Sequence, residues 1–450
     1  MFSAPSTPIS KPLAKFRADP IAFLRGLVRE QGDMPHFRMV GRRFVLANHP
    51  DAVREVLITH QSSFTKGPGL LRAEPLLGNG LLTSDGADHR RQRRQLQSAF
   101  SPAKLDEYLA VMRDSVRMMR DEWSDGETRD VHREMSRLTL EIALQTLFGA
   151  APLPPNPGGG GCREAGTASC PHLQMDGVGE AITNAIFSRY GKLTNEQNHP
   201  SDNLLPQDWG AGGPLTIAVD RLLQHHAGVD DTLLGLLFQE TGLASEVQDA
   251  ERRDQAMTFL IAGHESVSVA LAWAWYLLAR HTEIEARYHR EIDGWDGVNL
   301  SALVYTRAVI AETMRLYPPA WMMSREAQET VVVGGETMEA GTIVVVAPCV
   351  THQDARFFPE PHAFRPERWL EAETWPRFAY FPFGAGARKC IGDEFAWREM
   401  VLLMATLGRE WAPRFDSEAA PIPQPIVTLR PRGGMPMRLV RRSTESRLSS

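Results

Sequence analysis

The sequence contains few cysteines, little net charge and no long apolar run near its first residue. Four cysteines among 450 residues are too few for a disulfide scaffold and are typical of a reducing compartment. A net charge of −6 gives no reason to expect a nucleic-acid partner. Residues 1–16 lack the apolar run that a signal peptide or a membrane anchor requires. We therefore expect a cytoplasmic protein with no membrane anchor and no nucleic-acid partner.

The composition allows a large buried core, since 43% of the residues are hydrophobic. Residues 152–179 depart from this pattern because they are rich in proline and glycine, and we expect a mobile loop there. Cys162, Cys170 and His172 stand in this segment. One loose cysteine pair is weak evidence for a metal site, and we predict none there.

Periodicity predicts helices and strands along the rest of the chain. The predicted helices span residues 20–31, 51–59, 85–100, 108–122, 131–148, 252–280 and 309–317. The predicted strands span residues 37–40, 43–46, 318–325, 331–333 and 342–347, with a closing hairpin at 425–431.

The stretch 381–392, FPFGAGARKCIG, combines one cysteine with three glycines at the start of a predicted helix. Peptide N–H groups at a helix start stabilise negative charge, so we expect a lowered pKa for Cys390. Gly384, Gly386 and Gly392 would let the backbone approach a large flat group. With the aromatic ring of Phe383 and the cation of Arg388, this stretch predicts a thiolate ligand of haem iron. The alternative is a buried structural cysteine after a glycine-rich turn.

The predicted helix at 252–280 carries polar residues in an otherwise apolar stretch. Gly263 stands mid-helix, where glycine costs about 1 kcal/mol relative to alanine, so a packing or functional reason is expected. We interpret Gly263, with Ala262, as opening a groove over a cofactor face. Glu265 and Ser266 form an acid–alcohol pair that is suited to proton delivery. The alternative is an ordinary buried helix with a polar kink.

These motifs, in this order, resemble those of the cytochrome P450 superfamily. The matching patterns are F-x-x-G-x-R-x-C-x-G around Cys390, A-G-x-E with Ser266 in place of the usual threonine, E-x-x-R at 312–315, and P-E-R-W at 366–369. The similarity covers about residues 20–440, with a gap at 150–250. It implies the fold of that superfamily, a triangular haem-thiolate prism that is mainly α with a smaller β-region. It also implies a single domain over 1–450, in which 150–250 is a variable, partly mobile cap over the substrate.

The resemblance also implies residue roles. Glu312, Arg315 and Arg368 would form a buried structural salt bridge. The residues expected to contact haem are Cys390, Phe383, Gly392, Ala262 and Gly263, and, at its propionates, His89, Arg93, Arg325, Arg388 and His352. For His352 a satisfied structural histidine remains an equal alternative. The residues expected to line the substrate pocket are Ala262, Pro319, Ala320, Trp321, Met322, Val427 and Thr428.

The implied reaction is monooxygenation, in which one atom of dioxygen enters a C–H bond and the other leaves as water. The cofactor would be haem b, with electrons from NAD(P)H through a ferredoxin or flavodoxin and its reductase. Arg90, Arg91 and Arg94 form a positive patch that would dock such an acidic donor. We expect a monomer that acts on an apolar small molecule.

The substrate is predicted from shorter stretches. The runs LYPPAWMMSR and VTHQDARFFPEPHAFRPERW are similar to those of a carotenoid ring hydroxylase of a thermophilic bacterium. The β-carotene ring is therefore the first candidate, with a fatty acid or a terpenoid as alternatives. Two other classes stay open: a haem-thiolate protein that binds a ligand without turnover, and a haem-thiolate isomerase or dehydratase.

Overall fold

The computed structural model describes residues 11–71, 74–149, 219, 223, 232–239, 245–371 and 375–443. Cys162, Cys170 and most of the predicted cap at 150–250 lie outside these residues. The described helices are α1 Lys11–Ala18, α2 Pro20–Gln31, α3 Pro50–Arg54, α4 Pro68–Leu71, α5 Glu74–Leu77, α6 Gly86–Leu96, α7 Pro102–Glu122, α8 Val131–Phe148, α12 Leu233–Phe238, α13 Ser245–Arg280, α14 Thr282–Asp293, α15 Val304–Leu316, α16 Pro348–Thr351 and α17 Asp393–Gly408. Short π or 3₁₀ turns are η1 Glu55–Thr59, η2 Gln61–Ser63, η3 Gln97–Phe100, η4 Leu300–Ala302, η5 Pro366–Trp369 and η6 Gly386–Arg388.

The strands form one larger sheet and several two-stranded ribbons. The larger sheet has five strands in the order β1-β2-β8-β5-β3, with β2 and β8 parallel and the other pairs antiparallel. The ribbons pair β10 with β9, β11 with β4, and β6 with β7. The bounds are β1 His36–Met39, β2 Arg42–Leu46, β3 Phe64–Lys66, β4 Thr128–Asp130, β5 Met323–Ala327, β6 Val331–Val333, β7 Glu336–Met338, β8 Ile343–Val346, β9 Pro423–Pro425, β10 Leu429–Pro431 and β11 Pro436–Arg438.

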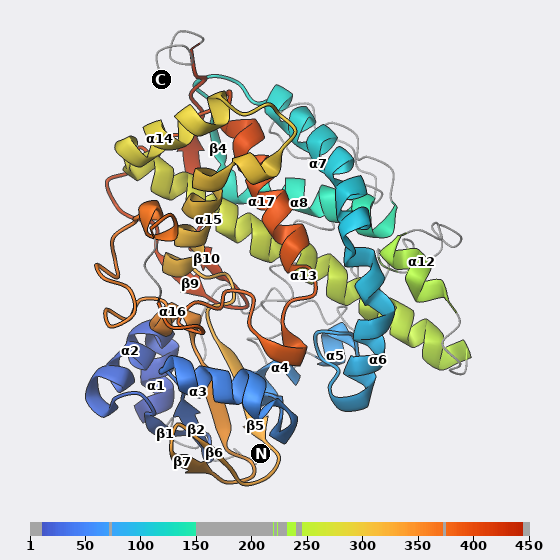
Figure 1. Ribbon diagram of the computed structural model, residues 1–450, viewed down its shortest axis with the longest axis vertical. Coiled ribbons are helices and arrows are strands. Elements are labelled where there is room, and N and C mark those ends of the chain that lie inside the picture. Colours follow the sequence, from blue (N-terminus) through green and yellow to red (C-terminus); the bar gives the residue numbers. More distant parts are fainter. Residues whose placement is uncertain are drawn as a thin grey trace, which may run out of the picture.

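Figure 1 shows the helices gathered in one large part of the molecule and the five-stranded sheet at the other end, beside α1, α2 and α3. The main hydrophobic cluster lies among α7, α8, α13, α14, α15 and α17. Helix α13 is long and apolar enough to cross a membrane, but 83% of its most apolar window is buried, as in a core helix. The predicted mainly helical architecture with a smaller β-region is confirmed.

Most local predictions agree with the structure. Helix α2 has the predicted bounds, and its N-cap Asp19 accepts a hydrogen bond from the N–H of Ala22 (2.9 Å). The hairpin of β1 and β2 turns at Gly41, where φ is +75°. One strand starts later than predicted: β5 begins at Met323 rather than at residue 318. The two prolines at 318 and 319 lack the N–H that a sheet requires.

Candidate cofactor and active site

The loop before α17 presents Cys390 at the start of that helix. The Cys390 N–H donates to the carbonyl oxygen of Phe383 (3.0 Å), and Gly392 is the N-cap of α17. Gly386 has φ of +71°, and a Cβ there would lie 2.1 Å from the carbonyl oxygen of Leu57. This glycine is therefore required for packing against the protein's own backbone, which differs from the predicted approach to a flat group. Gly392 likewise faces a ring of the protein, since its Cβ would lie 3.3 Å from Phe100.

Cys390 is exposed at the start of α17, yet enough protein surrounds it to desolvate its thiol. Burial raises the pKa of Cys390 to about 11, although the N–H of Gly392 and the charges of Arg93 and Lys389 act to lower it. The predicted lowering of this pKa is therefore wrong for the protein alone, because desolvation outweighs the helix start. A coordinating metal cation reverses that balance and holds a thiol deprotonated.

Helix α13 exposes a strip of small residues within a buried helix. Ala262 is exposed and Gly263 and Ser266 are half-buried, whereas His264 and Glu265 are buried. Positions 262 and 266 are four residues apart and share one helix face. The missing side chain of Gly263 points instead toward α8, where a Cβ would lie 3.6 Å from that of Ala143. The groove predicted for Gly263 is therefore provided by Ala262 and Ser266.

Phe100 connects this part of α13 to the cysteine loop. Its ring stacks on Phe259 of α13, with 5.9 Å between centroids, and packs against Gly392 and Phe395. Phe383 is half-buried in the same loop and its ring lies 6.0 Å from that of Trp397. Through Phe100, the part of α13 that carries the accessible strip therefore lies near the loop that carries Cys390.

Cations gather beside this region around a single carboxylate. Arg388 donates to Asp85 (Nη2 to Oδ1, 2.5 Å) and to the carbonyl oxygens of Gln61 and Phe64. Lys66, which the sequence analysis missed, is 5% exposed and donates from Nζ to the carbonyl oxygen of Leu81 (2.8 Å). Burial lowers the pKa of Lys66 to about 7, although Asp85 acts to raise it. A buried lysine in a short strand has no distinctive sequence pattern, so only the fold reveals it.

Three predicted propionate contacts belong to the same cluster. Arg325 on β5 is 8% exposed and lies directly opposite Lys66 on β3. Like charges at such a cross-strand pair are destabilising. His89 is buried and feels the charges of Lys66, Arg388 and Arg93, which with burial lower its pKa to about 4. Arg93 donates to the carbonyl oxygen of Lys389 (2.7 Å), beside Cys390.

This donor set fits haem. A buried excess of cations, relieved only by Asp85 within the described residues, is suited to two further carboxylates such as the haem propionates. A thiol and a strip of small side chains lie beside it and suit a metal and a flat ring system. Together, Cys390, the strip on α13 and the cation cluster could hold a haem.

Glu265 is bonded to the C-terminal hairpin and not to its sequence neighbour. Thr428 donates to Oε1 of Glu265 (2.8 Å), and Oε2 has no hydrogen-bond partner among the residues that the structure describes. The hydroxyl of Ser266 donates to the carbonyl oxygen of Ala262 (3.2 Å). Glu265 and Ser266 therefore each bond to another group and not to one another, and Thr428 bonds to the acid where a contact with substrate was predicted.

The remaining predicted pocket residues divide into open and packed positions. Ala320 is exposed, and Val427 and Met322 are half-buried. Pro319 is buried, and its carbonyl oxygen accepts from the N–H of Leu429 (3.1 Å). Trp321 is 5% exposed, donates to the carbonyl oxygen of Ile426 (2.9 Å) and packs in a hydrophobic cluster with Leu24 and Leu46. The prediction that Trp321 lines the pocket is therefore wrong, because its ring is part of that cluster.

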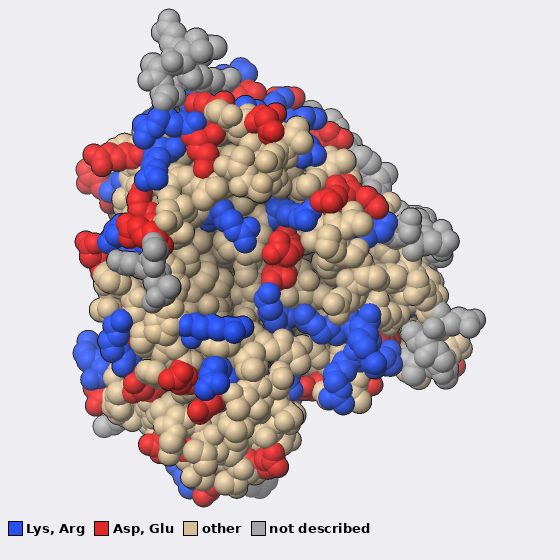
Figure 2. All heavy atoms as spheres, viewed as in Figure 1, with Lys and Arg blue, Asp and Glu red and all other residues tan. Residues whose placement is uncertain are grey.

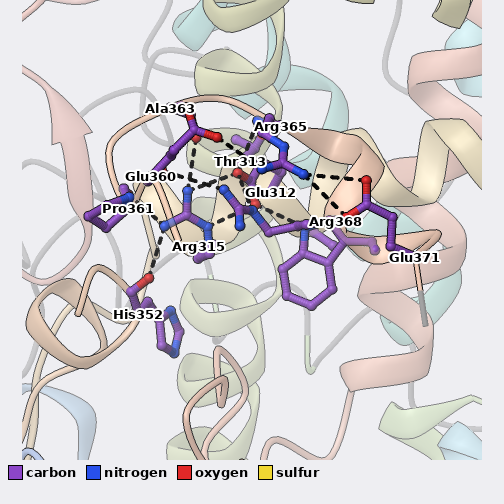
Figure 3. A network of polar contacts seen from close by, with 12 residues as sticks. Glu312, Thr313, Arg315, His352, Glu360, Pro361, Ala363, Arg365, Arg368 and Glu371 are labelled. Atoms are coloured by element: carbon purple, nitrogen blue, oxygen red, sulfur yellow. Dashed lines mark hydrogen bonds and ion pairs between the residues drawn. The ribbon is translucent and has the colours of Figure 1, made fainter. Parts of the chain in front are cut away.

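Glu312, Arg315 and Arg368 meet in a fully buried network (Figure 3). Glu312 accepts two hydrogen bonds from Arg315 (both 2.8 Å) and one from Arg368 (2.9 Å). Trp369, which was not predicted, adds a bond from its indole N–H to Oε2 of Glu312 (3.0 Å). Arg315 also donates to the carbonyl oxygens of His352, Pro361 and Ala363. The network thus ties α15 to the segment 352–369.

His352 belongs to this network and not to the cation cluster. It is fully buried, and its Nε2 accepts from the N–H of Phe381 (3.0 Å), at the start of the cysteine loop. Burial and the charge of Arg315 lower its pKa to about 3. Of the two predicted alternatives, the structural histidine agrees with this placement.

The arginines of α6 differ in exposure. Arg91 pairs with Glu251 (2.7 Å), whereas Arg90 and Arg94 are exposed. Figure 2 shows basic side chains gathered over α6 on this face of the molecule.

Comparisons with known proteins agree with these observations. The family model described as Cytochrome P450 matches residues 6–152 and 218–435. The chain is 34% identical to cyclooctatin synthase of Streptomyces melanosporofaciens, covering 94% of this chain and 91% of that protein. It is 36% identical to cyclooctat-9-en-7-ol 5-monooxygenase of the same organism, covering 87% and 84%. The solved structure of CYP175A1 from Thermus thermophilus matches with a TM-score of 0.74 and 29% identity, covering 95% and 97%.

Proposed function

The chain belongs to the cytochrome P450 family of monooxygenases, and from that premise we propose that it hydroxylates an apolar isoprenoid. The first candidate is the ring of β-carotene. The observation that carries the haem-thiolate part of the proposal is the exposed Cys390 next to Lys389, whose carbonyl oxygen accepts from Arg93 of the cation cluster. We also propose a single domain over 1–450, a monomer, and a cytoplasmic location.

Each group of residues has a task in this proposal. Haem b, when bound, supplies the activation of dioxygen. Cys390 would ligate its iron, and Lys66, Arg93, Arg325 and Arg388 would neutralise its propionates. Glu265, held by Thr428, would pass protons into the space beside Ala262, and the hydroxyl of Ser266 would orient them. Glu312, Arg315 and Arg368 act as structural support.

Electrons would come from NAD(P)H through a ferredoxin or flavodoxin and its reductase. Arg90 and Arg94 on α6 are exposed and sit in a protein of net charge −6, so they favour a local contact with an acidic donor. Arg93 on the same helix reaches the carbonyl oxygen of Lys389. The helix that carries the proposed docking surface therefore contacts the residue next to Cys390.

The substrate proposal rests on apolar positions around the accessible strip of α13. Ala262, Ala320 and Val427 are all apolar and partly or fully accessible. A carotenoid ring or another terpenoid would bury such surface favourably. The second candidate, a smaller cyclic terpenoid, is favoured by the name of the relative that acts on cyclooctat-9-en-7-ol. A fatty acid is a weaker candidate, because none of these three positions offers a charge to its carboxylate.

The experiment has two stages. The reduced protein with carbon monoxide should absorb near 450 nm, and Cys390→Ser should abolish this band. The protein is then supplied with NADPH, a ferredoxin and its reductase, and β-carotene, a cyclic diterpene alcohol and a fatty acid are compared as substrates. Hydroxylated β-carotene supports the first candidate, and turnover of the diterpene alone supports the second. If the substrates bound but gave no product with either a ferredoxin or a flavodoxin as electron donor, the result would support a ligand-binding protein and overturn the proposal.

A further inference from the structure

A cavity lies far from Cys390, at the other end of α17. It has a volume of about 520 Å³ and is bounded by α7, the segment that follows α14, and the C-terminal end of α17. Thr406 of its lining is 13 residues beyond Asp393, which is about 20 Å along a helix. The residues that line it are Arg113, Arg117, Arg120, Asp293, Trp295, Gly297, Leu402, Thr406, Arg409 and Glu410.

Three of these arginines lie on one face of α7. Arg113, Arg117 and Arg120 are spaced by four and three residues, so their side chains are neighbours on the helix surface. Like charges at this spacing repel one another and destabilise a helix. Arg409 adds a fourth cation from the end of α17. This concentration of positive charge favours an anion in the cavity.

The acids of the lining are already engaged. Asp293 is bonded to Arg442 (2.6 and 2.8 Å), which lies outside the lining. Glu410 is shared by Arg120 (3.4 Å) and by Arg441 (3.2 Å). Neither carboxylate therefore neutralises Arg113 or Arg409.

Arg113 and Arg409 are satisfied only by backbone carbonyl oxygens within the described part of the chain. Arg113 donates from Nη2 to Val298 (3.1 Å), and its buried Nε has no partner among the described residues. Arg409 donates to the carbonyl oxygens of Ile292 (3.0 Å) and Trp295. Arg117 has one exposed contact with Asp114 (3.5 Å). Within the described ranges, the guanidinium groups of Arg113 and Arg409 thus have no carboxylate within ion-pair distance.

We propose that this cavity binds a phosphate-bearing small molecule of nucleotide size. Guanidinium groups bind phosphate oxygens in bidentate fashion, and a phosphate carries nearly two negative charges, which matches Arg113 and Arg409. Trp295 and Leu402 border the cavity but are almost fully buried, so the volume of the cavity is what indicates an organic body beside the phosphate. A volume of about 520 Å³ suits a ligand larger than inorganic phosphate. The proposal is independent of the monooxygenase function, since it uses none of the residues assigned to haem.

Isothermal titration of the haem-loaded protein with ADP and with pyrophosphate tests this site. The expected result is one saturable ADP site per chain, with a Kd below about 1 mM at physiological salt. Arg113→Gln combined with Arg117→Gln should weaken ADP binding at least tenfold. A matched control, Arg29→Gln with Arg54→Gln, removes the same charge from two exposed arginines elsewhere and should leave binding unchanged.

The outcomes are distinct. Absence of saturable binding to both probes, or equal weakening by the two double variants, would overturn the proposal. Equal affinity for pyrophosphate and ADP would overturn the part that concerns an organic body. The variants' thermal unfolding and their carbon monoxide spectra should match those of the unmodified protein. Unchanged spectra then distinguish failure of this site from failure of the haem assignment.

Discussion

Thr428 of the C-terminal hairpin donates a hydrogen bond of 2.8 Å to Glu265 in the middle of α13. Both side chains are buried. Thr428 bonds to Oε1 of Glu265, and Oε2 has no hydrogen-bond partner in the described part of the protein. The position of this carboxyl group is therefore fixed by a residue 163 positions away.

Replacing Thr428 with valine keeps the side-chain shape and removes the hydroxyl. Both oxygens of Glu265 would then be buried without a partner in the described structure, which costs about 1–3 kcal/mol of unfolding free energy. We also expect a smaller fraction of NADPH electrons to reach product, because the acid loses its fixed position. Thr428→Ser keeps the hydroxyl and serves as the control. If valine and serine variants gave equal stability and equal electron yield, the bond would have no role in either.

Introducing threonine at position 266 tests the role of Ser266 in proton delivery. Ser266 donates to the carbonyl oxygen of Ala262 (3.2 Å), and serine lacks the methyl group that restricts the rotamer. We expect Ser266→Thr to lower the hydrogen peroxide released per NADPH consumed, with unfolding free energy changed by less than about 1 kcal/mol. Ser266→Ala should act in the opposite direction. An unchanged peroxide yield in both variants would remove Ser266 from the mechanism.

The sequence predicted what depends on local pattern. Helix α2 and the cysteine loop were found because caps, glycines and fixed spacing lie close together in the chain. Long-range relations were not predictable in the same way. The cross-strand pairing of Lys66 with Arg325 and the bond from Thr428 to Glu265 join segments far apart in the chain.

Two of the wrong interpretations have the same origin. Trp321 was assigned to the pocket because the resemblance implies that this segment runs past the haem, but the indole N–H donates to the carbonyl oxygen of Ile426 and the ring lies in a hydrophobic cluster. The pKa of Cys390 was expected to fall at a helix start, but burial outweighs that effect. In both cases tertiary burial, which a single sequence does not reveal, decides the outcome.

Removing the carboxylate of Glu312 from its buried network with Arg315 and Arg368 should cause a large loss of stability. Glu312→Gln leaves the guanidinium groups of Arg315 and Arg368 buried without a carboxylate, which costs about 3–5 kcal/mol. Urea unfolding of the haem-loaded protein measures this. Glu107→Gln, in the exposed pair with Lys104 at the same helical spacing, is the matched control and should cost less than about 0.5 kcal/mol. Similar costs for the two variants would contradict a special role for the buried network.

Replacing Lys66 should stabilise the haem-free protein but weaken its retention of haem. In the folded haem-free chain the pKa of Lys66 is about 7, below its usual value of 10.5, so folding disfavours the charged form. The unfolded chain therefore binds more protons between pH 7 and 10.5, and stability rises with pH in that window. The slope from this group is up to about 1.4 kcal/mol per pH unit.

Lys66→Met removes this cost, so the haem-free variant should be more stable than the unmodified chain at pH 6–7. The difference should shrink as the pH rises and vanish above about 10.5, where Lys66 is neutral in the unfolded chain as well as in the folded protein. Haem retention should change the other way, because a cation facing the propionates is lost. We expect haem transfer to apomyoglobin to accelerate about tenfold, which corresponds to about 1.4 kcal/mol. Lys15→Met, at an exposed lysine of α1, is the control and should leave transfer unchanged. A variant that retained haem normally would show that Lys66 is a structural residue only, since the lost cation would then have had no anion to bind.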